Sequence, residues 1–190
     1  MKRLLPLAVV IIAIFSATTY AQLEIGASYE LRDEDPQNGF GLRIEKGIFE
    51  SLPIVNLGLR LHGSYFSSDN NVSEGGITYS QDLTNYDIGV AAIGGISIGL
   101  LEPYVGLGLG TENYERAVSD IQNDPNNTAP QSGEESSLYW NMLAGAKVTI
   151  IPMIKPFVEY RYSSSELDEP ELQDVDSQTG RIMFGVSISF

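Results

Sequence analysis

The chain has one histidine and no cysteine, so a catalytic pair built on an imidazole base can be sought at one position only. The histidine, His62, is followed two positions later by Ser64. A histidine base beside a serine nucleophile is a reasonable arrangement for acyl transfer. The two residues therefore form one candidate catalytic pair. The lack of cysteine excludes disulfides and any zinc or iron–sulfur site built on thiolates.

Two acidic runs are candidates for cation binding. They are Asp33-Glu34-Asp35 and Glu166-Leu167-Asp168-Glu169, the second followed by Asp174 and Asp176. Carboxylate oxygens suit Ca²⁺ and Mg²⁺, but neither run has the spacing of an EF-hand loop, and acidic runs are usually solvated. We predict no metal site and no cofactor, and a calcium site in these runs stays open as an alternative.

A glycine series at Gly106, Gly108 and Gly110 has the composition of a phosphate-binding loop but not its context. Glycine-rich phosphate loops join a strand to a helix. Here the glycines alternate strictly with Val105, Leu107 and Leu109, and no helical pattern follows. The series is therefore typical of a strand whose small residues face a crowded interior.

Alternation of apolar and polar residues extends over almost the whole chain and predicts strands. It is clearest at the end, where Ile182, Phe184, Val186, Ile188 and Phe190 share one face. About ten residues match the length that a tilted strand needs to cross a bilayer. The predicted strands are 23–32, 40–48, 55–66, 84–94, 103–113, 137–149, 155–164 and 181–190.

The connections between these strands alternate in kind. Those at 33–39, 67–82, 114–136 and 165–178 are polar and mostly long, whereas those at 49–54, 95–102 and 150–154 are shorter and apolar. Long loops at one end and short turns at the other are typical of outer-membrane barrels. The predicted fold class is all-β: a closed, eight-stranded, antiparallel up-and-down transmembrane β-barrel with a polar lumen filled by side chains.

The first residues have the features of a secretory signal peptide. Basic Lys2 and Arg3 precede an apolar run at 4–15, and small residues at Thr19 and Ala21 suit a cleavage site. We predict a signal peptide at 1–21 and a single barrel domain at 22–190. The net charge of −14 argues against nucleic acid as a partner, since binding phosphates depends on Lys and Arg.

The polar face of the predicted strands carries small residues and charges of both signs, which suits the narrow lumen of an eight-stranded barrel. We predict a structural polar network there, formed by Glu24, Glu30, Arg43, Glu45, Arg60, His62, Asp87, Lys147, Glu159, Arg161 and Arg181. Aromatic residues at the strand ends predict two interfacial girdles. One consists of Tyr29, Tyr65, Tyr86, Trp140, Tyr160 and Tyr162 near the long loops, the other of Tyr104, Phe157 and Phe190 near the short turns.

Three segments, 103–110, 155–162 and 181–190, resemble strands of the small outer-membrane β-barrel superfamily that includes the OmpA transmembrane domain and OmpX. The resemblance implies insertion by the barrel-assembly machinery, which reads a terminal aromatic residue such as Phe190, and a chain that often has no enzymatic role. His62-Gly63-Ser64 also resembles the His-x-Ser motif of outer-membrane lipid A deacylases. It departs from that family in two ways. Tyr65 follows the serine where the family has Asn, and the motif lies in the third strand where the family carries it near the C-terminus.

The sequence therefore predicts a non-enzymatic outer-membrane protein, with lipid and lipopolysaccharide as its surroundings. We expect it to contribute to membrane integrity, to present acidic extracellular loops for surface recognition or adhesion, or both. The loop at 115–136 is the best candidate for contact with an unknown surface partner, since long loops on a rigid scaffold commonly carry binding. Two alternatives stay open: a narrow channel, and a lipid-modifying enzyme that uses His62 and Ser64.

Overall fold

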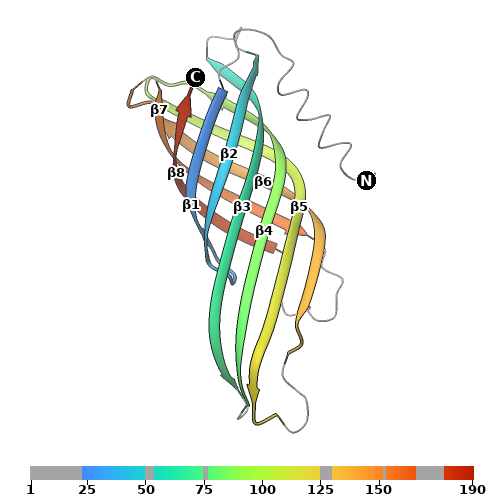
Figure 1. The fold of residues 1–190 in the computed structure, drawn as a ribbon. Helices are drawn as coiled ribbons and strands as arrows, with labels where there is room; N and C mark the ends of the chain where they lie inside the picture. The colour runs from blue at the N-terminus through green and yellow to red at the C-terminus, as the bar shows by residue number, and fades with distance from the viewer. Residues whose placement is uncertain (1–22, 50–53, 75–76, 125–129, 152, 166–177) are drawn as a thin grey trace.

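A computed structural model describes residues 23–49, 54–74, 77–124, 130–151, 153–165 and 178–190. The predicted signal peptide and the acidic run at 166–176 lie outside these ranges. The eight strands are β1 Leu23–Arg32, β2 Asn38–Phe49, β3 Val55–Glu74, β4 Ile77–Ile96, β5 Leu101–Gln122, β6 Gly133–Val148, β7 Ile154–Ser165 and β8 Gln178–Ser189. Each strand pairs antiparallel with the next, and β8 pairs with β1, so the sheet closes into a barrel (Figure 1). The predicted fold class is confirmed.

The strands are strongly tilted. Following paired residues once around the barrel leads from Leu23 through Lys46, Leu59, Ala92, Leu107, Met142 and Tyr162 to Gly180, which pairs with Asp33. The circuit thus returns to the first strand ten residues from where it began (23 to 33). A stagger of ten residues over eight strands corresponds to a tilt of roughly 40° from the barrel axis.

The apolar face of each strand points outward and the polar face inward. Leu138, Leu109 and Phe40 are 77%, 66% and 69% exposed, whereas Arg60 and Ser187 are 0% exposed. A soluble barrel would have the opposite arrangement, because its apolar face fills the core. Among the described residues, no helix is long and apolar enough to span a membrane.

The prediction that 67–82 and 114–136 are loops is wrong for most of the described residues there. β3, β4 and β5 are 20, 20 and 22 residues long, and the β3–β4 ladder continues to the Glu74–Ile77 pair. These segments lack the apolar face by which we recognised strands, but backbone ladders and polar pairs, such as Ser80 Oγ donating to Asn71 Oδ1 at 2.9 Å, hold them together. We call 67–74, 77–83 and 117–122 the β3–β5 arm.

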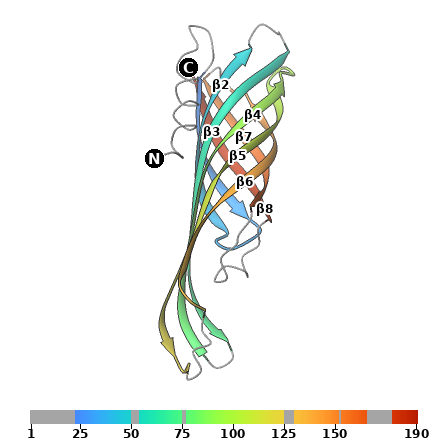
Figure 2. The same cartoon turned by 90° about the vertical axis from the view of Figure 1, so that its right-hand side faces the viewer.

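The β3–β5 arm projects well beyond the barrel at the end where the long connections lie, as two views at right angles show (Figures 1 and 2). The opposite end carries the tight connections Ile98–Leu101 and Ile151–Ile154. We refer to these as the long-loop end and the short-turn end.

The structure places the residues of one predicted girdle on the outside of the barrel, whereas two of the three residues of the other lie in the lumen, so that prediction is wrong for them. Near the long-loop end Tyr29, Tyr65, Tyr86, Trp140 and Tyr160 are exposed by 42–53%, and Tyr162 is half-buried. At the short-turn end, Tyr104 and Phe157 are 5% and 6% exposed and point into the lumen. Their position in the strand decides this: Tyr104 shares its face with Gly106, and Phe157 shares its face with Glu159. Phe190, 68% exposed, lies outside as predicted.

Candidate functional site

The structure brings all eleven residues of the predicted polar network into the lumen. Ten of them are buried at 6% exposure or less. The exception is Glu45, whose side chain is 13% exposed. They come from seven of the eight strands, so the network links almost the whole circumference of the barrel.

Glu159 on β7 is the centre of one cluster, in the half of the lumen near the short turns. Its Oε2 accepts hydrogen bonds from Arg60 Nη1 and, at 2.7 Å, from Tyr104 Oη. Arg43 Nη1 lies 3.4 Å from the same oxygen, and Arg161 Nη2 donates to Oε1 at 3.3 Å. One buried carboxylate thus faces three guanidinium groups, which offset the cost of burying the charges only as long as every partner is present.

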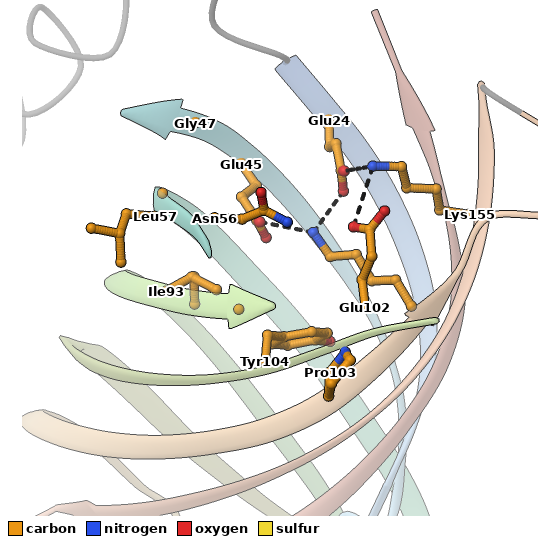
Figure 3. Close-up of a pocket in the computed structure, with 13 residues that line it drawn as sticks. Glu24, Glu45, Gly47, Asn56, Leu57, Ile93, Glu102, Pro103, Tyr104 and Lys155 are labelled. Carbon is orange, nitrogen blue, oxygen red and sulfur yellow. Dashed lines mark hydrogen bonds and ion pairs between the residues drawn. The ribbon is translucent and has the colours of Figure 1, made fainter. Parts of the chain in front are cut away.

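A row of alternating acids and bases, which we call the mouth ladder, leads from this cluster to the short-turn end (Figure 3). It runs Glu45, Lys147, Glu24, Lys155 and Glu102. The first three ion pairs are 2.7–2.8 Å long, and the last is 3.5 Å. Arg60 joins the ladder to the cluster through Glu45 at 2.8 Å.

The mouth ladder lines a cavity of about 70 Å³ at the short-turn end, whose wall is formed by residues of β1 to β7. The rest of its wall includes Gly47, Ile93 and the ring of Tyr104 (Figure 3). A cavity of this volume holds a few water molecules. It is a recess at the mouth rather than a passage.

Asp87 on β4 is the centre of a second cluster. Arg181 Nη1 donates to Asp87 Oδ2 at 2.6 Å and lies 3.6 Å from Glu30 Oε2. Tyr139 Oη donates to Asp87 Oδ1 at 3.3 Å and lies 3.0 Å from His62 Nε2. The histidine is therefore held in the lumen through a tyrosine, within a buried hydrogen-bonded chain.

Nearer the long-loop end, Arg32 on β1 closes the lumen. Its guanidinium donates to Asn85 Oδ1 at 2.6 Å, to Tyr114 Oη and to Thr179 Oγ1 at 3.3 Å. Asn85 Nδ2 donates in turn to Glu112 Oε1 at 2.9 Å. The rings of Phe66 and Tyr114 lie 4.9 Å and 5.4 Å from the guanidinium carbon.

Sequence reasoning missed several charged side chains of the lumen, among them Glu102, Glu112, Arg116 and Lys155. The first three lie on the inward face of β5, and each is separated from Gly106, Gly108 or Gly110 by an even number of residues. Extending the alternation of the glycine series in both directions would have found them. Lys155 shares its face with Glu159, four residues further along β7.

Glycines create the space for the larger lumen side chains. A methyl group at Gly185 on β8 would meet the ring of Phe157 and the carbonyl oxygen of Ala27. Against the same ring lies the guanidinium of Arg43, its central carbon 3.3 Å from the ring centroid. Gly185, the ring of Phe157 and the guanidinium of Arg43 are thus stacked. The ring lies so close to position 185 that only glycine fits there.

The geometry of His62 and Ser64 differs from that of a nucleophile and its base. Both are buried in the lumen at 3% and 6% exposure, and the hydrogen bond of the imidazole goes to Tyr139. In the part of the chain that the structure describes, Ser64 Oγ makes no hydrogen bond. A catalytic serine would need contact with its base and access to the acyl chain of its substrate.

Within the described ranges, no group of three or more Asp, Glu or His side chains is placed to hold a metal ion. The first acidic run, Asp33-Glu34-Asp35, lies in these ranges. Its Asp33 accepts from the backbone N–H of Gly180 at 2.9 Å and 3.1 Å. This carboxylate fastens the β1–β2 connection to β8.

No family model matches the chain, and no curated protein matches its sequence. Solved structures do match over nearly its whole length. A major outer membrane protein from Thermus thermophilus is 13% identical with a TM-score of 0.69, over 90% of this chain and 100% of that one. Neisserial surface protein A is 17% identical with a TM-score of 0.59, over 90% and 97%.

The chain has the fold of the small outer-membrane β-barrels. A third example is Ail, the attachment invasion locus protein of Yersinia pestis, solved in complex with the heparin analogue sucrose octasulfate. It is 18% identical with a TM-score of 0.52, over 90% of this chain and 97% of that one. At these identities the likeness concerns the outer-membrane barrel fold alone, and it confirms the fold that the resemblance implied.

Proposed function

We propose that this chain is exported by its N-terminal segment, is inserted into the outer membrane, and acts there as a non-enzymatic surface-recognition protein that also contributes to membrane integrity. The observation that supports this best is the contrast between a barrel filled with paired charges and an arm that extends far beyond it. A filled barrel has no obvious transport role, and a projecting arm can reach a partner outside the lipid.

The β3–β5 arm has properties of a binding surface. The β2–β3 ladder stops at the Gly39–Phe66 pair and the β5–β6 ladder at the Arg116–Gly133 pair. Among the described residues, each outer strand of the arm therefore has a ladder partner on one side only. On the outer edge of β5, Val118 N donates to Ser132 Oγ at 2.9 Å. Open strand edges offer backbone hydrogen bonds to another chain.

The charge of the arm favours a basic partner. Asp69, Asp82 and Asp120 are all exposed on it. Arg116, at its base, is 5% exposed. The proposed partner therefore presents lysine- or arginine-rich surface, attracted over a Debye length of about 8 Å at physiological salt.

The geometry gives less support to the two alternatives. A channel would need a continuous opening, but Arg60, Glu159 and Arg181, each at most 1% exposed, fill the cross-section. A deacylase would need His62 beside Ser64 at the lipid face, whereas both face the lumen. We therefore propose neither, and steady conductance in a planar bilayer or altered lipid A on expression would contradict us.

The first test concerns the membrane. The protein recovered from the outer-membrane fraction should migrate fast on a gel in mild SDS without boiling and shift to its full mass on heating, since a closed barrel resists the detergent. A soluble species with no shift would contradict the proposed location.

The second test concerns recognition by the arm. The triple variant Asp69→Asn, Asp82→Asn and Asp120→Asn removes three charges and keeps the shape. Asn suits position 120 because the residue there has a φ of 52°, and Asn tolerates left-handed backbone. In nanodiscs, we expect binding to an immobilised lysine-rich peptide to weaken at least tenfold at low salt. The unchanged gel shift is the control for folding, and unchanged binding would exclude the acidic arm as the recognition surface.

A further inference from the structure

The short-turn end of the barrel is apolar where a water-exposed end would be polar. Six residues of its connections, Ile54, Ile98, Leu100, Ile150, Ile151 and Met153, are exposed by 49–67%. We call this group the turn collar. Side chains of this kind on a tip that faces water would form an exposed apolar patch, and such patches mark contact with a membrane or a partner.

The backbone of the turn collar is suited to an apolar medium, in which every unpaired N–H or C=O is costly. The β4–β5 connection closes on itself: Ile98 N donates to Leu101 O at 2.8 Å, and Leu101 N donates to Ile98 O at 3.1 Å. The β6–β7 connection closes in the same way, with Ile154 N donating to Ile151 O at 3.0 Å.

Neighbouring connections also satisfy one another. The carbonyl oxygen of Leu100 accepts from Thr149 N at 2.8 Å, although it lies at the tip of its turn. Likewise, Met153 O accepts from Ser189 N, and Ile54 O accepts from Ser97 N, both at 2.9 Å. The turns are thus hydrogen-bonded to one another around the end of the barrel. Turns that faced water independently would not need these bonds between neighbours.

Among the described residues, the polar side chains of Ser97 and Thr149 in these connections are bonded to the protein as well. Asn56 Nδ2 donates to Ser97 Oγ at 2.9 Å. Thr149 Oγ1 donates to Glu102 Oε1 at 3.0 Å, toward the mouth ladder. Apolar side chains remain on the outer surface of the end.

The apolar belt extends along the barrel as far as the turn collar. On β6 the aromatic residue nearest the long-loop end of the belt is Trp140, 43% exposed. At about 3.3 Å per residue and a tilt of roughly 40°, the ten residues from Trp140 to Ile150 rise about 25 Å along the axis. An outer-membrane barrel presents an apolar band about 25 Å tall. Counted from Trp140, the band ends in the turn itself; counted from Leu138, 77% exposed on the same face, it ends at Val148, the last residue of β6.

We infer that the turn collar is immersed in the acyl chains of the leaflet on the short-turn side, so that this end of the barrel lies within the membrane. The inference rests on the proposed membrane location. Lipid is the occupant because, among the described residues, the collar continues the outward apolar faces of β3 to β7 and lies at the edge of the apolar band.

The experiment uses the cysteine-free chain, into which single cysteines can be placed without removing others. Ile98→Cys and Ile151→Cys report on the collar, Leu107→Cys on the belt and Asn70→Cys on the arm, each labelled with an environment-sensitive fluorophore. The full chain is reconstituted at low protein-to-lipid ratio in phosphatidylcholine vesicles. Spin-labelled lipid serves as the membrane quencher, and iodide, present on both sides, as the aqueous one.

We expect the probes at 98, 151 and 107 to be quenched at least threefold more by the lipid than by iodide, and the probe at 70 to show the reverse. If position 107 is lipid-quenched but 98 and 151 are quenched by iodide, the inference is wrong and the membrane barrel stands. If position 107 is also quenched by iodide, the proposed location itself fails. Probes at 98 and 151 that are shielded from both quenchers at every dilution would indicate a protein contact and would overturn the lipid assignment.

Discussion

Strands β3, β4 and β5 contribute to both the lumen and the β3–β5 arm, but their charged residues are buried and paired in the lumen and exposed in the arm. Along β4, Asp87 in the barrel is 4% exposed and is paired with Arg181, whereas Asp82 in the arm is exposed. A buried charge is costly without its partner, and an exposed one is stabilised by water. The same residue type therefore has a structural role in one region and is open to recognition in the other.

This difference shows how a barrel can change its surface without losing its fold. Charge pairs in the lumen join residues from all eight strands, so a substitution there affects the entire ring. The arm is held by ladders between neighbours, as in the Asn71–Ser80 pair. We expect its sequence to be replaceable as long as the ladders persist. The following predictions test that contrast.

The largest expected effect is at Glu159. Glu159→Ala leaves Arg43, Arg60 and Arg161 without their shared carboxylate, and we expect it to lower the free energy of unfolding by about 3–5 kcal/mol. Urea unfolding from lipid vesicles, followed by the fluorescence of the single tryptophan, measures this. Asp69→Asn in the arm is the control and should change stability by less than about 0.5 kcal/mol. Equal losses of stability in the two variants would contradict the proposed difference between buried lumen charges and exposed arm charges.

The next effect separates two exposed apolar residues on the same strand. Leu107 in the belt and Ile121 in the arm are 64% and 48% exposed. Leu107→Arg should cost about 2–4 kcal/mol, since it places a cation near mid-bilayer. Ile121→Arg should cost about 0.5 kcal/mol or less, because it faces water. The fraction of protein showing the heat-dependent gel shift reports the result, and similar losses would mean that the belt does not face lipid.

The smallest effect concerns packing in the lumen. Gly185→Ala should destabilise the barrel by about 1–3 kcal/mol, because its methyl group would displace the ring of Phe157 from the guanidinium of Arg43. Gly94→Ala is the matched control, since a methyl group there would meet a side-chain carbon of Leu57 at an ordinary 3.6 Å. Thermal unfolding of both variants should separate them, and equal midpoints would show that the lumen can relax around the added group.

Much of the barrel was predictable from alternation. The eight strands, their order, and the facing of residues such as Arg43 or Leu109 follow from a period of two that persists when one face meets lipid and the other a polar lumen. The arm was not predictable in this way. Both of its faces meet polar surroundings over most of their length, so residues such as Asn70 and Gln81 carry no periodic signal even though they pair.

The sequence by itself determined which residues face inward, because alternation is a local property of the extended backbone. Only the tertiary structure decided which of them meet. Glu159 and Arg60 lie on β7 and β3. The stagger of the closed sheet decides which residues of such distant strands lie at the same height in the lumen and can meet. Register and stagger arise from all eight ladders together. For that reason the inward placement of His62 was open to sequence reasoning, whereas its hydrogen bond to Tyr139 was not.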